Sequence, residues 1–182
     1  MATPPDFTAG QVLTAAQMNA IGLWKVSAST FSAAASHSVN NCFTSDFDAY
    51  RVIAHFSSST SLTTTMRLRV GGVDNSGASS YGITILKAFN STTDSSTSNT
   101  SSFGFSGTAQ GAITALSFDI WQPAVAVNTV INGLTTQGMI AENAKTSTFW
   151  GRHDVNTAFD GFTLIASTGN ITGYVKVYGY RN

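Results

Sequence analysis

The chain has 182 residues, enough for one domain of ordinary size with a buried core and a short appended segment. Its net charge is zero and only 10% of its residues are charged, so it lacks the clustered Lys and Arg through which proteins bind nucleic acid. With one cysteine the chain cannot form an internal disulfide. No apolar run approaches the roughly 20 residues of a membrane span. From the charge and the apolar runs we expect neither a nucleic-acid nor a membrane partner.

Serine and threonine together make up about a quarter of the chain. Threonine favours strands, serine favours turns, and both keep a surface polar without charge. Such a surface suits close packing among many neutral copies. The first residues lack the basic start and the apolar run of a secretory signal, so we expect assembly in a reducing cytoplasm.

The first 25 residues carry the only helix signals. Thr14 and Gln17 have the spacing of a capping box, and Gly22 is placed to end the helix after about two turns. A helix this short is marginal in water, so packing must hold it. It either plugs the end of its own domain or docks onto another chain. We favour the second interpretation, with an anchor formed by Val12, Leu13, Met18, Ile21 and Trp24.

After Trp24 the apolar residues recur with period two, which is typical of strands with one buried face. The segment 50–56 is predicted to bury Tyr50, Val52, Ala54 and Phe56. The segment 63–70 is predicted to bury Thr64, Met66, Leu68 and Val70 and to expose Thr65, Arg67 and Arg69. Further strands are predicted over 81–87, 113–121, 125–131, 138–141, 146–152, 162–167 and 173–180.

Gly, Asn, Asp and Ser separate these segments, as expected of turns. The run 90–102, almost entirely Ser, Thr, Asn and Asp, is predicted to be an exposed loop, and no strand is assigned to residues 25–42. Many short strands with frequent turns predict an all-β fold, an antiparallel β-sandwich or jelly roll over residues 26–182. Residues 1–25 precede it as the lead-in and helical anchor.

No residue pattern points to catalysis or to a bound metal. The three histidines, His37, His55 and His153, lack the spacing of a zinc signature, and no GxSxG motif is present. His153 beside Asp154 is read as the end of a strand, and Cys42 as a small buried residue. Glu142 is the one glutamate, and most aspartates lie where turns are expected. Asp119 is expected to face solvent or pair with an arginine, so we predict no enzyme activity and no cofactor.

The best candidate surface is aromatic. Tyr174, Tyr178 and Tyr180 fall on one face of the predicted last strand, together with Lys176. Tyrosines of this kind bury their rings while their hydroxyls stay in water, which suits a subunit interface. Exposed tyrosines and Trp150 could equally stack against a sugar. The sequence leaves these two alternatives open.

The amino-terminal pattern of Phe7, Gly10 and "VLTAAQMN" resembles the first segment of bacteriophage virion proteins described as minor tail or tail-fibre proteins. The pieces "FTSDFDAYRVIAHF", "MRLRV", "SSYG", "SFDIWQP" and "GYVKVYGYR" follow in an order that resembles the β-rich body of the same proteins. The resemblance implies a structural, oligomeric particle protein, with a trimer as the expected state.

We therefore expect a non-enzymatic virion protein, assembled in the host cytoplasm, that is tail-associated or part of a tail fibre. Its partners would be other virion proteins, further copies of itself and a glycan on the host surface. Two alternatives stay open. The first is a capsid decoration or head-fibre protein anchored on the phage head. The second is a free carbohydrate-binding module.

Overall fold

The computed structural model describes Gly10, Val12 and residues 22–89, 92–108, 110–138 and 145–180. The helix predicted after Thr14 lies outside the described residues, and so do Leu13, Met18 and Ile21 of the predicted anchor. Most of the strand predicted over 138–141, and Glu142, also lie outside them. Within the described part the protein is all-β, and its strand pairs are antiparallel, which confirms the predicted all-β, antiparallel class.

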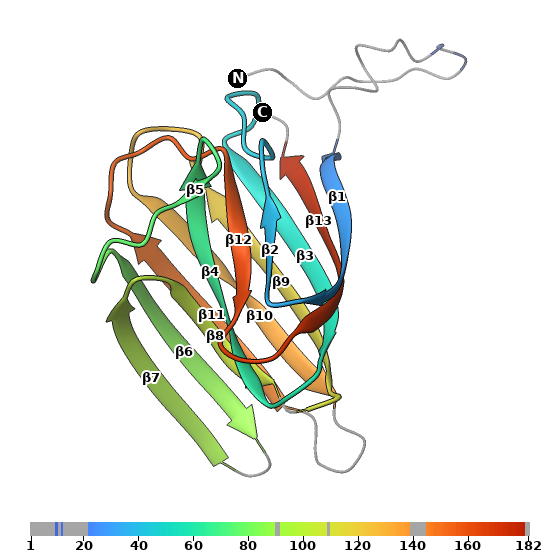
Figure 1. The fold of residues 1–182 in the computed structure, drawn as a ribbon. Coiled ribbons are helices and arrows are strands. Elements are labelled where there is room, and N and C mark those ends of the chain that lie inside the picture. The colour runs from blue at the N-terminus through green and yellow to red at the C-terminus, as the bar shows by residue number, and fades with distance from the viewer. Residues whose placement is uncertain are drawn as a thin grey trace.

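Eight strands form the larger sheet, which spans the back of the molecule in Figure 1. Their order across the sheet is β1 (Leu23–Ala34), β13 (Ile171–Tyr180), β3 (Ala49–Ser58), β9 (Ile113–Trp121), β10 (Thr129–Gly138), β11 (Lys145–His153), β6 (Tyr81–Phe89) and β7 (Thr92–Thr100). Strands β9 to β11 follow one another along the chain, whereas β13 lies between β1 and β3. The first and last strands therefore pair in one sheet.

Five strands form the smaller sheet, in front of the larger one in Figure 1. They are β2 (Ser36–Val39), β12 (Gly161–Ala166), β4 (Leu62–Val70), β5 (Val73–Asp74) and β8 (Phe103–Thr108), the last of which pairs with β4. The architecture is two-layered and sandwich-like. Each sheet thus has an inner face toward the other sheet and an outer face.

Aromatic side chains from both sheets fill the space between them. Phe118 of β9 and Phe162 of β12 lie with ring centroids 6.5 Å apart, and Phe105 of β8 and Phe149 of β11 with centroids 4.9 Å apart. All four belong to one continuous hydrophobic core. Buried aromatic pairs of this kind contribute their large apolar area and a further edge or stacking interaction. The core fixes which face of each strand points outward.

The predicted alternation in β3 is confirmed, because Tyr50, Val52, Ala54 and Phe56 are all buried. In β4 the prediction is right for Thr64, Met66 and Leu68 but wrong at the end of the strand. Val70 is exposed and Arg69 is buried. Val70 precedes the Gly71–Gly72 turn, beyond the core. Arg69 keeps the outward side of the strand, like Arg67, but polar partners cover its guanidinium there, with Nη1 2.7 Å from Thr163 Oγ1 and 3.5 Å from Asp74 Oδ1.

Two predictions about where strands lie were wrong, and one stretch of strand was missed. The run 90–102, predicted as a loop, supplies the edge strand β7, which pairs with β6 residue for residue from Thr92 to Thr100. An edge strand needs backbone hydrogen bonds but little apolar alternation, so the periodicity does not reveal it. Residues 25–42, which received no strand, contain most of β1 and all of β2. The strand predicted over 125–131 begins only at Thr129.

Candidate functional site

The outer face of the larger sheet gathers the residues that the sequence singled out. In β13, Val175 and Val177 point into the core and are buried. Tyr174, Tyr178 and Tyr180 alternate with them and are partly exposed, as is Lys176. The predicted aromatic stripe is therefore a real feature of the outer face.

The register of the strands adds Trp150 to the same face. Reading across the sheet, Tyr178 pairs with Arg51, Arg51 with Asp119, Asp119 with Asn132, and Asn132 with Trp150. Directly paired residues share a face, so Tyr178 and Trp150 look out on the same side. They are separated by four strand spacings, roughly 19 Å. The candidate residues do not converge on one pocket but are spread over a broad surface.

An ion pair occupies the middle of this row. Arg51 Nε lies 2.7 Å from Asp119 Oδ1, and Arg51 Nη2 lies 2.6 Å from Asp119 Oδ2. The Tyr180 hydroxyl donates to Asp119 Oδ1 at 2.6 Å. Burial by itself raises the pKa of Asp119, but the hydrogen bonds from Arg51 and Tyr180 and the charge of Arg51 outweigh it and lower the pKa. Asp119 therefore pairs with an arginine, one of its two predicted states, and the face carries no net charge here.

Apolar side chains surround this pair. Trp150 is 54% exposed, Leu134 43%, Leu86 42% and Ile53 37%, and all occupy outward positions of their strands. Trp121 and Val130, which pair with each other on the same face, are exposed as well. We define Ile53, Leu86, Trp121, Val130, Leu134 and Trp150 as the apolar face. It extends over β3, β9, β10, β11 and β6.

Sequence reasoning missed most of the apolar face. The signal was present in the segment 50–56, where Ile53 is apolar although it lies opposite the predicted core positions. Leu134 and Leu86 fall on outward positions in the same way. A strand that is apolar on both faces indicates burial on both sides, either inside the domain or against a partner.

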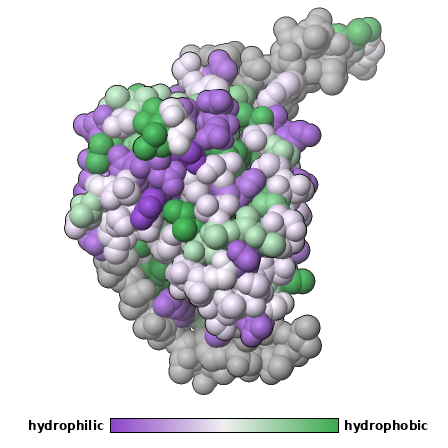
Figure 2. Space-filling view, viewed as in Figure 1, coloured by the Kyte–Doolittle hydropathy of each residue, from purple (hydrophilic) through white to green (hydrophobic). Residues whose placement is uncertain are grey.

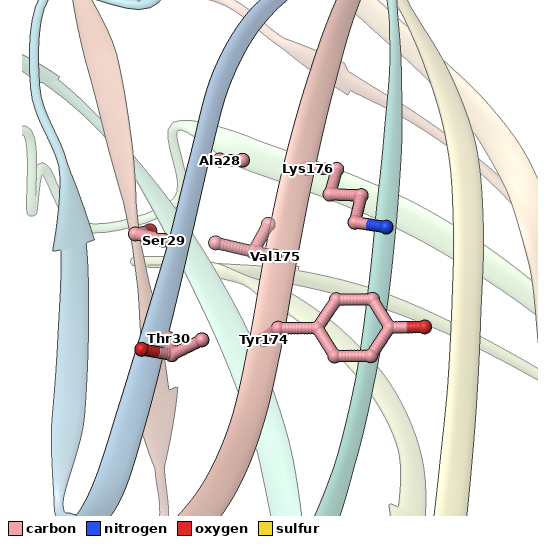
Figure 3. A pocket seen from close by; sticks show the side chains of 6 residues that line it. All are labelled: Ala28, Ser29, Thr30, Tyr174, Val175 and Lys176. Carbon is pink, nitrogen blue, oxygen red and sulfur yellow. The ribbon is translucent and has the colours of Figure 1, made fainter.

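A shallow hollow lies at the edge of this surface, between β1 and β13 (Figure 3). Its lining includes Ser29 and Thr30 of β1 and Tyr174 and Lys176 of β13. The Lys176 ammonium lies 4.9 Å from the centroid of the Tyr174 ring, and His55 stacks on the same ring at 5.6 Å. These contacts hold the Tyr174 ring in place, and the lining offers neither a carboxylate nor a metal ligand.

The opposite side of the molecule has a different character. The outward positions of β2, β4 and β12 are mostly polar, among them Ser36, Ser38, Thr65, Arg67 and Thr163. Figure 2 shows this side as mainly polar, with scattered hydrophobic residues. The two outer faces thus differ in chemistry. The outer face of the smaller sheet is suited to contact with water, and that of the larger sheet to contact with another molecule.

The residues considered for catalysis are accounted for by structure. His153 ends β11 and is buried, with its ring 4.3 Å from that of Tyr81 and Nε2 3.3 Å from Asn75 Oδ1. Its neighbour Asp154 instead pairs with Arg152 at 2.5 Å. Cys42 is fully buried, and burial raises the pKa of its thiol. Among the described residues, no group of three His, Cys, Asp or Glu could hold a metal ion.

Two anchor residues belong to the described part. Val12 is exposed. Trp24 is also exposed, but it lies in β1 and pairs with Gly179 of β13, so it is part of the sheet and not of a helix. The sheet therefore starts at Leu23, two residues before the predicted end of the anchor segment.

No family model, curated protein or solved structure matches the chain. Within the described residues no helix is long and apolar enough to cross a membrane.

Proposed function

We propose that this protein is a non-enzymatic structural subunit of a bacteriophage particle, tail-associated or part of a tail fibre, built as a β-sandwich that binds its neighbours through the outer face of the larger sheet. The observation that carries the proposal is the difference between the two outer faces. Exposed apolar side chains gathered on one face, opposite a polar face, mark an interaction site.

The particle assignment is supported by the sequence pattern of the first residues and by the order of the strand segments. Val12, Leu13, Met18 and Ile21 supply an apolar segment ahead of the sheet, suited to docking on another virion protein. Charge plays little part in such contacts, in keeping with a chain in which only 10% of residues are charged. Homo-oligomerisation belongs to the same proposal, and the sequence resemblance implies a trimer.

Immunogold labelling of particles from cultures that express the gene tests this function. Label on the tail supports the leading assignment, and label on the head supports the capsid decoration or head-fibre alternative. A chain that lacks residues 1–21 keeps all of β1 and should fold but no longer enter particles. A chain that never purifies with particles would contradict the proposal.

Trp150 favours a second function, binding of a glycan on the host surface. It is the most exposed tryptophan of the described part, and it is flanked across the sheet by Asn132 and Thr84. An exposed indole on a flat sheet beside polar side chains is suited to stacking on a sugar ring. Saturable binding of the isolated chain to host surface glycans, lost in Trp150→Ala, would support this function and the free-module alternative. Absence of binding would refute it.

A further inference from the structure

We infer that the outer face of the larger sheet packs against the same face of a second copy of this chain. The inference rests on the proposed function, because it names the partner of the surface that carries it. It is an alternative to glycan binding, because Trp150 lies on the face that the second copy would cover. Three observations favour a second copy over an unrelated partner: the size of the face, its relief and its charge.

The face has the size of a stable interface. Eight strands at about 4.8 Å spacing give a width of roughly 34 Å, and most of them are nine or ten residues long, or about 30 Å. The area is therefore on the order of 1,000 Å². A standard protein interface covers about 800 Å² on each partner, so a face of this size can support a specific dimer.

One row of side chains across the face is complementary to itself. One row across the sheet reads Ile53, Ser117, Leu134, Thr148 and Leu86, on β3, β9, β10, β11 and β6 in that order. Large side chains on β3, β10 and β6 alternate with small ones on β9 and β11. In this row the Leu and Ile side chains are thus separated by gaps above Ser117 and Thr148, whereas the adjacent row places Asp119 on β9 and Trp150 on β11.

A twofold axis that runs along the strands, between β9 and β10, brings these Leu and Ile side chains onto these gaps. It lays β10 of one copy over β9 of the other, so that Leu134 meets Ser117 of the second copy. The same operation lays Ile53 over Thr148 of the second copy. Isologous contacts of this kind are the commonest in homo-oligomers, and aligned sheets pack face to face at about 10 Å.

The charge of the face also permits contact with itself. Arg51 is held by Asp119 in the same sheet, and Arg152 by Asp154. Two copies can therefore meet without bringing unpaired like charges together. Lys176, which lies beside Ile53 on the same face, falls over Leu86 of the second copy in this arrangement and is five strand spacings from the second Lys176.

The mass of the full-length chain in solution, measured by sedimentation over a range of concentrations, tests the inference. We expect a dimer. Leu134→Asp places a carboxylate in the contact and should weaken association at least tenfold. The matched control is Val73→Asp, which changes a 70% exposed valine of the smaller sheet and should leave the mass unchanged. Circular dichroism verifies that both variants fold.

Crosslinking tests the arrangement of the two copies. In the variant Ile53→Cys with Thr148→Cys, a bis-maleimide of about 10 Å span should join the two copies. The native Cys42 is fully buried and should not react. Val73→Cys serves as the control and should remain uncrosslinked.

Two results would overturn the inference: a wild-type chain that is monomeric at every concentration, or an oligomer whose mass Leu134→Asp leaves unchanged. A dimer that the Ile53 and Thr148 cysteines fail to crosslink would overturn the twofold arrangement. These outcomes are separable from the proposed function. A monomeric chain that enters particles refutes only the dimer, whereas a dimer that never enters particles refutes only the virion function.

Discussion

Arg51 and Asp119 face each other across β3 and β9 and form two hydrogen bonds, at 2.7 and 2.6 Å. They are 68 residues apart in the chain, and the sheet places them side by side at the centre of its outer face. The Tyr180 hydroxyl, from a third strand, completes the coordination of the carboxylate. Their charges cancel where the surrounding side chains are apolar, which suits this surface to contact.

The Asp119→Asn variant should lower the free energy of unfolding by about 1 kcal/mol, because the lost ion pair is partly exposed and solvent screens it. The pKa of Asp119 is lower in the folded chain than in the unfolded chain. Its contribution is therefore present above the unfolded pKa of about 4 and is lost as the pH falls through the folded pKa. Urea denaturation of wild type and variant between pH 7 and pH 3 measures both effects. The control Asp154→Asn removes a more exposed pair and should change stability by less than about 0.5 kcal/mol.

The burial of His153 makes the fold sensitive to mild acid. Burial lowers the pKa of its imidazole below the usual 6.5. A backbone hydrogen bond with Val155 and the charge of Asp154 raise the pKa and offset this effect only in part. Well above pH 6.5 the imidazole is neutral in both the folded and the unfolded chain. Below it the unfolded chain takes up a proton that the folded chain resists, so stability falls by up to about 1.4 kcal/mol per pH unit. Thermal unfolding from pH 8 to pH 5 should show a weaker pH dependence in His153→Gln, and equal slopes would contradict this assignment.

Gly173 of β13 is required by the close approach of β3. A Cβ at this position would overlap the carbonyl oxygen of His55 and the backbone of Phe56. The Gly173→Ala variant should therefore be destabilised by about 2 kcal/mol or more, since backbone cannot move aside as a flexible side chain can. Gly104→Ala is the matched control in a strand, with no atom within 4 Å of the added Cβ. Chemical denaturation of the two variants should differ, and equal stability would show that the strands can separate there.

Arg69 stabilises the smaller sheet by satisfying partners on neighbouring strands. Its guanidinium lies 2.7 Å from Thr163 Oγ1 and 3.5 Å from Asp74 Oδ1. Arg69→Ala should cost about 2 to 3 kcal/mol, because it leaves a partly buried carboxylate without its cation. Arg67→Ala, on the same strand but more exposed, should cost less than about 1 kcal/mol. The denaturation midpoints of the two variants measure these costs. A larger loss of stability in Arg67→Ala than in Arg69→Ala would contradict this account.

Much of the fold could be predicted because the alternation of apolar and polar residues along a strand follows the alternation of buried and exposed side chains. In β3, β9, β11 and β13 every second residue faces the core, and each of these strands was predicted to within two residues. The strand predictions were poorer where the sequence shows no such alternation. Strand β7 is an edge strand of polar residues, and β1 has irregular pairing between Lys25 and Ser27 and between Phe31 and Ala34. Edge strands and bulges depend on backbone pairing, which the periodicity of the side chains does not reveal.

The sequence by itself determined the all-β class, the inward residues of the central strands and the aromatic stripe of Tyr174, Tyr178 and Tyr180, since these follow from local alternation. Only the tertiary structure decided that Trp150 shares their face, that Arg51 neutralises Asp119, and that Ile53, Leu134 and Leu86 form ridges of one apolar surface. The register between strands far apart in the chain creates these relations. Register is set by the packing of the whole core and by the turns, so no single segment encodes it.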